Sequence, residues 1–584
     1  MDKNTFLAIL LSVVVISGGF FIQTTYFMPE EVNTPFIEKE SIVVEDSNSS
    51  VTNTSVSSNS LSVSDNQVFF DSNINESDYV SEIIKVETNK FYIEFNTDGA
   101  VITSMKLKDH MNGDNEVDMI LNNETGLGSF GLAFGENYDS YLTDTFQFVA
   151  DKKNNTYSFI RDYQIKESNG SISSPFRIEK KFVFFPDEYL FELRINITNS
   201  KNSSIPLNIN NQAYTLSFGP QIGPDYKKLD GRNEYRKYYS LSGEKRTTHK
   251  PKNGYAETAE QIKWTAIVGK YFTVIGIPSS GTSKAVWSNS NIDGLKDASE
   301  MFYVRSSINS SRNEDVYQFY LGPKNNKNLT IYNNSMDNTI GFSNMYLDKV
   351  VDSSSWLGWL EFILKFVLEG VYKIIPNYGV AIILLTILIK IVLFPFTHKS
   401  YESTGKMQSI QPKVKEIQTK YKNDPNKMNK EMADLYKKEG VNPMGGCLPM
   451  LIQMPIFFAL YGLLNKYFDL RGAVFIPGWI NDLSASESIW NFGAFTLPIL
   501  GWNDLRLLPI LYLGTQLLMS KFTQAPSGGG QNAMQTKMLT LGMPIMFFFI
   551  LYDMPSGLLL YWTVTNLLTA VQQGLISKKK KKQA

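Results

Sequence analysis

The chain has 584 residues, enough for two or three domains, and its 56 lysines and arginines are balanced by 57 aspartates and glutamates. This balance disfavours a nucleic-acid-binding protein, which usually needs an excess of positive charge, so we expect no specific DNA binding. The single cysteine, Cys447, excludes a disulfide framework and a cysteine-based zinc site. The sequence shows no HExxH, GxSxG, P-loop or helix-opening GxGxxG motif, and we therefore expect no enzyme, no cofactor and no metal.

An apolar run over residues 6–22 follows a short polar start. It could be a cleaved signal peptide or an uncleaved membrane anchor. Because no A-x-A-like site of small residues follows the run, we interpret residues 1–27 as a transmembrane signal anchor. Residues 28–79 include the stretch SNSSVTNTSVSSNS, and this low complexity is typical of a flexible linker.

Residues 80–350 carry the patterns of an all-β domain. Over residues 189–198, apolar side chains alternate with polar ones, which predicts a strand with one buried face. Residues 96–99, Asn-Thr-Asp-Gly, separate two apolar stretches and predict a hairpin, because Asp-Gly suits the positive φ of a tight turn. We predict a β-sandwich. Its cleft could bind a sugar or a peptide, or the domain could be a structural or docking module.

Residues 356–373 predict an amphipathic helix with two strips. Charged residues at intervals of four form one strip: Glu361, Lys365, Glu369 and Lys373. Apolar residues form the other: Trp356, Leu360, Ile363, Val367 and Val371. The helix could pack on the sandwich or lie at the membrane interface. We favour the interface, because a membrane span follows at once.

The last part of the chain, residues 377–577, predicts a core bundle of membrane helices. The expected spans are residues 377–396, 446–465, 505–522, 536–552 and 558–576. With the N-terminal anchor they make six transmembrane helices, so the predicted fold is an α-helical polytopic membrane bundle joined to an all-β sandwich.

Basic residues orient this bundle. Ten lysines lie in residues 398–446 and five in the tail, residues 578–584, against three basic residues in residues 465–506. The positive-inside rule makes the first two regions cytoplasmic. Six spans then place both termini in the cytoplasm and the sandwich on the outer side of the membrane.

Residues 398–440 predict a cytoplasmic helical hairpin. Its first helix has an apolar seam that steps by three and four: Met407, Ile410, Val414, Ile417 and Tyr421. Its second helix carries a shorter stripe: Met428, Met432 and Leu435. Asp424 is expected to cap the second helix and Pro425 to open it. The hairpin is either a charged surface that enforces topology or a basic arm that meets an incoming chain or ribosomal RNA.

Lys390 is a charge inside the apolar run of residues 377–396. A lysine at the centre of a membrane costs about 2.5–3.5 kcal/mol on insertion scales. It could snorkel to the interface, or it could lie in a wet cavity inside the bundle. We favour the cavity, because Thr386 lies one turn away and polar residues such as Gln453 occur in the other spans.

One long segment carries a resemblance to a known family. Residues 441–461, VNPMGGCLPMLIQMPIFFALY, closely resemble the signature of the YidC family of membrane protein insertases. Residues 555–562 look like the final helix pair of the family, and residues 410–413 look like the start of its cytoplasmic hairpin. Residues 321–324 and 270–272 are similar to periplasmic motifs of Gram-negative members.

The resemblance implies a five-helix core around a hydrophilic groove that is open to cytoplasm and lipid and closed toward the periplasm. The groove cation of the family, commonly arginine, corresponds to Lys390, which keeps the charge but lacks the planar guanidinium fork. Residues that face the substrate in the family correspond to Thr386, Tyr561 and Trp562. Together with Gln453, these residues form the expected substrate groove.

The implied function is a membrane protein insertase and chaperone of the bacterial inner membrane. Its expected partners are nascent membrane proteins, the Sec translocon with its accessory subunits, the translating ribosome and membrane lipids. The lysine-rich tail suits contact either with the ribosome or with anionic lipid.

Two other classes of protein were weighed against the insertase. A small-solute transporter would usually show internal repeats with paired interrupted helices, and the spans show no such symmetry. A membrane-anchored enzyme or sugar-binding protein would work through the sandwich, where the sequence offers no catalytic pair.

Overall fold

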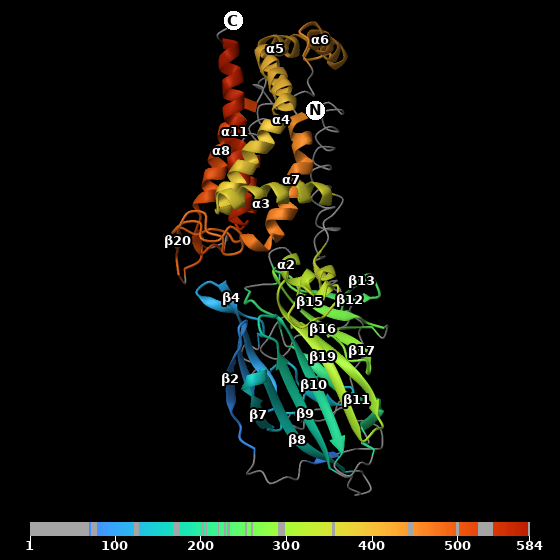
Figure 1. The fold of residues 1–584 in the computed structure, drawn as a ribbon. Coiled ribbons are helices and arrows are strands. Elements are labelled where there is room, and N and C mark those ends of the chain that lie inside the picture. The colour runs from blue at the N-terminus through green and yellow to red at the C-terminus, as the bar shows by residue number, and fades with distance from the viewer. Residues whose placement is uncertain are drawn as a thin grey trace, which may run out of the picture. The chain divides into compact units, whose positions relative to one another are not determined.

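The computed structural model divides into one unit of strands, which ends at Asp352, and one unit of helices after it (Figure 1). The predicted anchor and most of the predicted linker lie outside the described residues. The structure describes residues 69–71, 79–121, 128–166, 175–199, 204–205, 207–219, 221–226, 229, 234–251, 254–258, 261–289, 298–352, 357–441, 448–493, 495–497, 501–523 and 541–581.

Within the described residues, the first unit is built from antiparallel strands, one short α-helix and a few 3-10 turns. The strands and the α-helix are β1 (Phe69–Asp71), β2 (Ile83–Glu87), β3 (Phe91–Asn96), β4 (Val101–Asn112), β5 (Asn115–Asp118), β6 (Leu132–Phe134), β7 (Gln147–Asp151), β8 (Thr156–Lys166), β9 (Phe176–Phe184), β10 (Leu190–Asn199), β11 (Leu207–Phe218), β12 (Lys237–Ser242), β13 (Lys245–His249), β14 (Tyr255–Thr258), β15 (Trp264–Val268), β16 (Phe272–Ile277), β17 (Thr282–Ser288), β18 (Glu300–Ile308), β19 (Arg312–Pro323) and α2 (Asn326–Leu329).

These strands form three sheets. A ten-stranded sheet has the order β1-β8-β9-β10-β19-β16-β15-β12-β13, with β7 paired to β8. A five-stranded sheet has the order β14-β17-β18-β11-β6, and a four-stranded sheet has the order β2-β3-β4-β5. The domain is therefore rich in β-structure, as the alternation of apolar and polar residues predicts.

Two local predictions for this unit are confirmed, and one is wrong. In β10, Phe191 and Leu193 are buried in the predicted alternation, and the strand pairs with β9 and β19 on its two sides. The hairpin between β3 and β4 turns at Gly99, whose φ is +73°. Residues 69–71, however, belong to a strand and not to the linker. They pair with β8, because two phenylalanines favour an extended strand at a sheet edge.

A lysine occupies an inward position of β9. Lys180 is fully buried, and its Nζ donates hydrogen bonds to the carbonyl oxygens of Gly99, Ala100 and Phe130 at 3.0, 2.5 and 2.7 Å. All three acceptors have positive φ, which is costly for alanine and phenylalanine. Burial lowers the pKa of Lys180 to about 7. The side chain thus holds two backbone segments, at residues 99–100 and at residue 130, whose buried carbonyls would otherwise lack donors.

The two periplasmic motifs noted in the sequence lie side by side. Phe272 of β16 pairs with Pro323 of β19. The backbone N–H of Lys324 donates to the carbonyl of Tyr271 at 2.7 Å, and its Nζ donates to the carbonyl of Gly269 at 2.6 Å. Burial lowers the pKa of Lys324 to about 8. The motifs thereby join neighbouring strands of the large sheet.

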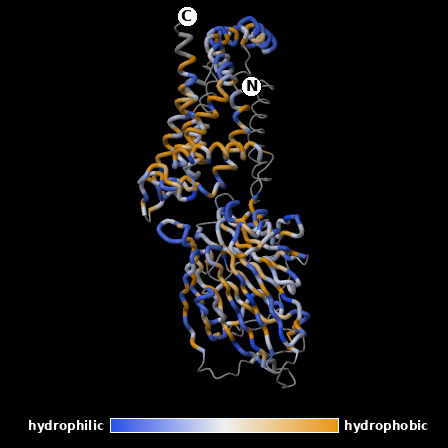
Figure 2. Tube along the Cα trace, viewed as in Figure 1, coloured by the Kyte–Doolittle hydropathy of each residue, from blue (hydrophilic) through white to orange (hydrophobic). Residues whose placement is uncertain are grey.

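The second unit is helical. It contains α3 (Gly358–Ile374), α4 (Tyr378–Ser409), α5 (Gln411–Lys420), α6 (Pro425–Lys438), α7 (Leu448–Lys466), α8 (Leu507–Thr523), α10 (Met543–Leu551) and α11 (Ser556–Lys581), with a small ribbon of β20 (Trp490–Asn491) and β21 (Asp504–Leu505). Apolar residues dominate α7, α8 and the first part of α4, whereas α5 and α6 are mostly hydrophilic (Figure 2).

Within the described residues, one helical stretch, Tyr378–Met407, is long and apolar enough to cross a membrane. Leu451–Lys466 and Leu507–Ser520 are shorter apolar stretches. The predicted span of residues 536–552 is represented by α10, and its first residues lie outside the described part.

The end of the span in α4 differs from the prediction. The helix does not stop near Phe396 but runs to Ser409, so Met407 and the predicted start of the hairpin belong to α4. The sequence changes from apolar to polar near Phe396, but no residue there acts as a cap that would stop the helix. Pro395 removes one backbone donor. The helix continues across it, and the Thr397 hydroxyl donates to two carbonyls of the preceding turn.

Helix α3 forms where the amphipathic helix is predicted. It buries Leu364 and Leu368, whereas Ile363 of the predicted apolar strip is 47% exposed. The charged strip contacts the end of α7, where the Tyr467 hydroxyl donates to Glu369 Oε1 at 2.8 Å. The sequence alone could not reveal this polar neighbour. Large apolar side chains remain exposed on α3: Trp359, Phe362 and Phe366.

The hairpin of α5 and α6 begins later than predicted. Asp424 caps α6 by accepting a hydrogen bond from the backbone N–H of Lys427 at 3.1 Å, and Pro425 opens the helix, as predicted. A cluster holds the hairpin to the end of α4, and it contains Met407, Ile410, Val414, Met432, Leu435, Tyr436 and Val441. The other predicted seam residues lie outside this cluster: Ile417, Tyr421 and Met428.

Candidate functional site

Lys390 is held by residues of two other helices. Its Nζ donates to Thr569 Oγ1 of α11 at 2.8 Å and to Gln453 Oε1 of α7 at 3.5 Å. Both acceptors are neutral. An ammonium has three N–H donors, so these two contacts leave one donor for another partner.

A buried polar row on α11 continues from this contact. The row consists of residues at intervals of four that are each less than 9% exposed: Tyr561, Thr565, Thr569 and Gln573. The Tyr561 hydroxyl has the side chains of Thr565 and Gln453 as hydrogen-bonding neighbours, and Gln453 also accepts from Lys390. The row therefore extends the polar contacts of Lys390 along the buried face of α11.

The two remaining groove candidates are packed inside the unit. Thr386 is buried, and its hydroxyl donates to the carbonyl of Ile382 in its own helix at 2.7 Å. Trp562 stacks on Phe457 of α7 with ring centroids 5.1 Å apart, and its indole N–H has no partner among the described residues. Trp562 thus joins α11 to α7, whereas the Thr386 hydroxyl is used within α4.

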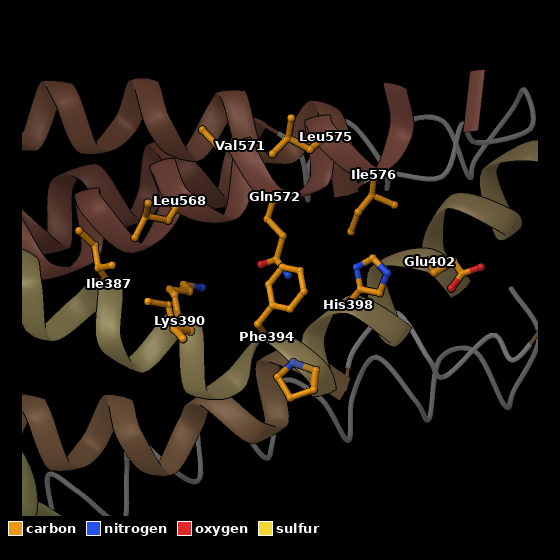
Figure 3. A pocket seen from close by; sticks show the side chains of 12 residues that line it. Ile387, Lys390, Phe394, His398, Glu402, Leu568, Val571, Gln572, Leu575 and Ile576 are labelled. Carbon is orange, nitrogen blue, oxygen red and sulfur yellow. The ribbon is translucent and has the colours of Figure 1, made fainter. Parts of the chain in front are cut away.

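A pocket of about 680 Å³ lies between α4 and α11 (Figure 3). Of the predicted groove residues, Lys390 alone lines it. The lining from α4 consists of Ile387, Lys390, Ile391, Phe394, Pro395, His398 and Glu402, and that from α11 of Leu568, Val571, Gln572, Leu575 and Ile576.

Four of the α4 residues follow one another at intervals of four along the pocket: Lys390, Phe394, His398 and Glu402 (Figure 3). Residues at this spacing share one ridge of a helix. The rings of Phe394 and His398 stack with centroids 5.4 Å apart, and His398 Nδ1 is buried without a partner among the described residues. Glu402 lies 3.8 Å from Lys406, one turn further along α4. The pocket therefore has a cation and a carboxylate with aromatic rings between them.

The opposite wall, from α11, is mostly apolar. Gln572 is its polar member, and its Nε2 donates to Thr397 Oγ1 of α4 at 3.1 Å. This contact joins the two helices beside the aromatic pair. The wall suits an apolar segment, because it offers aliphatic surface for burial. Within the described residues there is no group of three metal-ligating side chains.

Two family models match nearly the whole chain. Residues 83–369 match the YidC periplasmic domain, and residues 370–583 match the 60Kd inner membrane protein. The chain belongs to the YidC family of membrane protein insertases. Membrane protein insertase YidC of Treponema denticola is 40% identical over 100% of both chains, and that of Treponema pallidum is 32% identical over 98% of both.

Among solved structures, an active YidC insertase crystal structure with its first transmembrane domain resolved covers 85% of this chain and 93% of its own. It is 17% identical with a TM-score of 0.36, which is too low to bear on how the helices are arranged. The family matches nevertheless make this chain a membrane protein with a periplasmic β-rich domain.

In this YidC-family chain, the sequence pattern indicated the Lys390 cation but only some of the residues around it. Lys390 and Gln453 were predicted and do contact each other. Thr569, His398 and Glu402 were not predicted. Residues at intervals of four indicate a row along one side of a helix, and two such rows occur here: Lys390, Phe394, His398 and Glu402, and Tyr561, Thr565 and Thr569. The first row was not recognised, because the span was predicted to end near residue 396, which divided the row between two elements.

Proposed function

We propose that this chain helps hydrophobic segments of newly made proteins enter and fold in the bacterial inner membrane, with the Lys390 cation as the contact for their polar tails. The observation that carries this proposal is the setting of Lys390, which lines a pocket and is held by two neutral oxygens. The mechanism needs no covalent catalysis and no cofactor.

The pocket would lower two parts of the insertion barrier. An acidic tail gains attraction from the ammonium, which is strong where little water screens it. Polar backbone groups of the tail gain hydrogen-bonding partners from the hydroxyls of the buried row, at Tyr561 and Thr565. Apolar side chains of the client meet the aliphatic wall of α11. The tail therefore crosses part of the membrane beside polar groups and not beside hydrocarbon alone.

The topology belongs to the same proposal. Six transmembrane helices, with residues 1–27 as the first and the insertase core at residues 377–577, place both termini in the cytoplasm. The lysine-rich hairpin and the tail support this orientation. We include the Sec translocon, the translating ribosome and anionic lipids as partners, because the basic hairpin and tail suit the last two. The exposed aromatic side chains of α3 support an interfacial position.

Insertion into liposomes tests this function. Purified full-length protein should insert a short single-span client with an acidic tail in the absence of ATP, measured by protease protection of the tail. The controls are empty liposomes and liposomes with an unrelated membrane protein. Insertion no faster than in these controls would refute the proposal.

A further inference from the structure

The pocket presents opposite charges in a fixed order. Lys390 and Glu402 both line it and are twelve residues apart on α4. At ~1.5 Å per residue, about 18 Å of helix separates them. Phe394 and His398 lie between the two charges. In the proposed topology Glu402 lies on the cytoplasmic side of Lys390.

We infer that the pocket takes a client segment with an acidic residue followed by a basic residue, and that Glu402 is the residue that recognises the base. The inference rests on the proposed function and adds a specificity to it. An extended chain advances ~3.3 Å per residue, so about 18 Å corresponds to five or six residues. A tail that leads with its N-terminus would place its acidic residue at Lys390 and its basic residue at Glu402.

Glu402 is suited to exchange partners. Its distance to Lys406 is 3.8 Å, and the two side chains are 45% and 53% exposed. Such exposed pairs contribute only about 0–1 kcal/mol, so a client cation can compete with Lys406 for the carboxylate. His398 Nδ1, which is unpaired within the described residues, adds a hydrogen-bonding group between the two charges. A single lipid headgroup is too small to reach both charges, which favours a polypeptide as the occupant.

The test uses three matched clients and the full-length protein in liposomes. Each client has one Asp in its N-terminal tail and, six residues later, either Lys, Gln or Glu. We expect wild-type protein to insert the Lys client about two- to fivefold faster than the Gln client, the ratio that a partly exposed ion pair supports. Glu402→Gln should bring this ratio to one, and Glu402→Lys should favour the Glu client. Glu416→Gln, at an exposed position of α5, should keep the wild-type ratio.

The outcomes separate this inference from the function on which it rests. If wild-type protein inserts the clients but Glu402→Gln keeps the full ratio, Glu402 does not recognise the base. If Glu402→Gln slows all three clients by one factor, and that factor follows the lipid headgroup composition, the pocket binds lipid and the inference is wrong. If no client is inserted faster than in empty liposomes, the proposed function fails and this specificity fails with it.

Discussion

Two buried or half-buried lysines, one in each unit, have opposite surroundings. Lys180 in the β-rich unit is fully enclosed, and three backbone carbonyls accept from its Nζ. Lys390 in the helical unit has two neutral side-chain acceptors and lines a pocket. The first has used all three donors of an ammonium, whereas the second has one left. A buried charge is therefore structural or functional according to whether its donors are already satisfied.

The largest expected effect concerns the enclosed lysine. Lys180→Met should lower the free energy of unfolding of the β-rich unit by about 3 kcal/mol, because three buried carbonyls lose their donor. Urea unfolding of the detergent-solubilised chain, with hydrogen exchange at β9 to identify the unit, measures this change. Lys181→Met is the matched control at the adjacent, partly exposed position. Equal loss in both variants would show that the three hydrogen bonds contribute little.

The second prediction tests the lysine that faces the pocket. Lys390→Glu should insert clients with acidic tails about tenfold more slowly than Lys390→Arg, since like charges repel where the tail must bind. A tenfold change corresponds to ~1.4 kcal/mol. A client with a neutral tail serves as the control, because its rates should differ less. Equal rates for the two variants with acidic clients would mean that the charge at this position is incidental.

The third prediction uses pH. Burial lowers the pKa of Lys180 from 10.5 to about 7, so the unfolded chain binds more protons than the folded one between these values. Stability should therefore rise as pH increases from about 7 to 10, by at most ~1.4 kcal/mol per pH unit, and should not vary with pH through this group well below pH 7. Lys324 adds to the same trend, because its pKa is lowered to about 8. The difference between wild type and Lys180→Met isolates Lys180, and parallel pH profiles for the two would contradict the assignment.

The smallest expected effect concerns the polar row on α11. Thr565→Val removes a buried hydroxyl that neighbours the Tyr561 hydroxyl. Stability should change by less than ~1 kcal/mol, while insertion should fall about twofold because a polar contact for the client is lost. Thr563→Val is the control, since that hydroxyl donates to the carbonyl of Leu559 at 2.8 Å. If Thr565→Val inserts clients at the wild-type rate, the row does not serve the client.

Local patterns predicted the features that depend on neighbours in the chain. The burial of Phe191 and Leu193 follows from the period of two in β10, and the turn at Gly99 follows from its tolerance of positive φ. The cap at Asp424 follows from its place before Pro425. Each of these features depends on the conformational preferences of a few consecutive residues. Tertiary contacts in this protein reinforce those preferences.

Features that depend on distant partners were predicted poorly. The change in composition predicted that the membrane helix ends near Phe396. Helix α4 nevertheless continues, because a change from apolar to polar side chains does not break backbone hydrogen bonds. The polar neighbour of α3 was not predicted, because Tyr467, which supplies the partner for Glu369, lies almost a hundred residues away. His398 and Glu402 were assigned to the cytoplasmic hairpin, because the membrane helix was predicted to end near Phe396.

The two lysines show where this boundary lies. The sequence by itself determined the family and placed a charge in an apolar helix at Lys390. Only the tertiary structure decided that three carbonyls enclose Lys180, whereas Thr569, Gln453 and a pocket surround Lys390. The reason is physical: periodicity fixes which way a side chain points, but packing between distant segments fixes what it meets there.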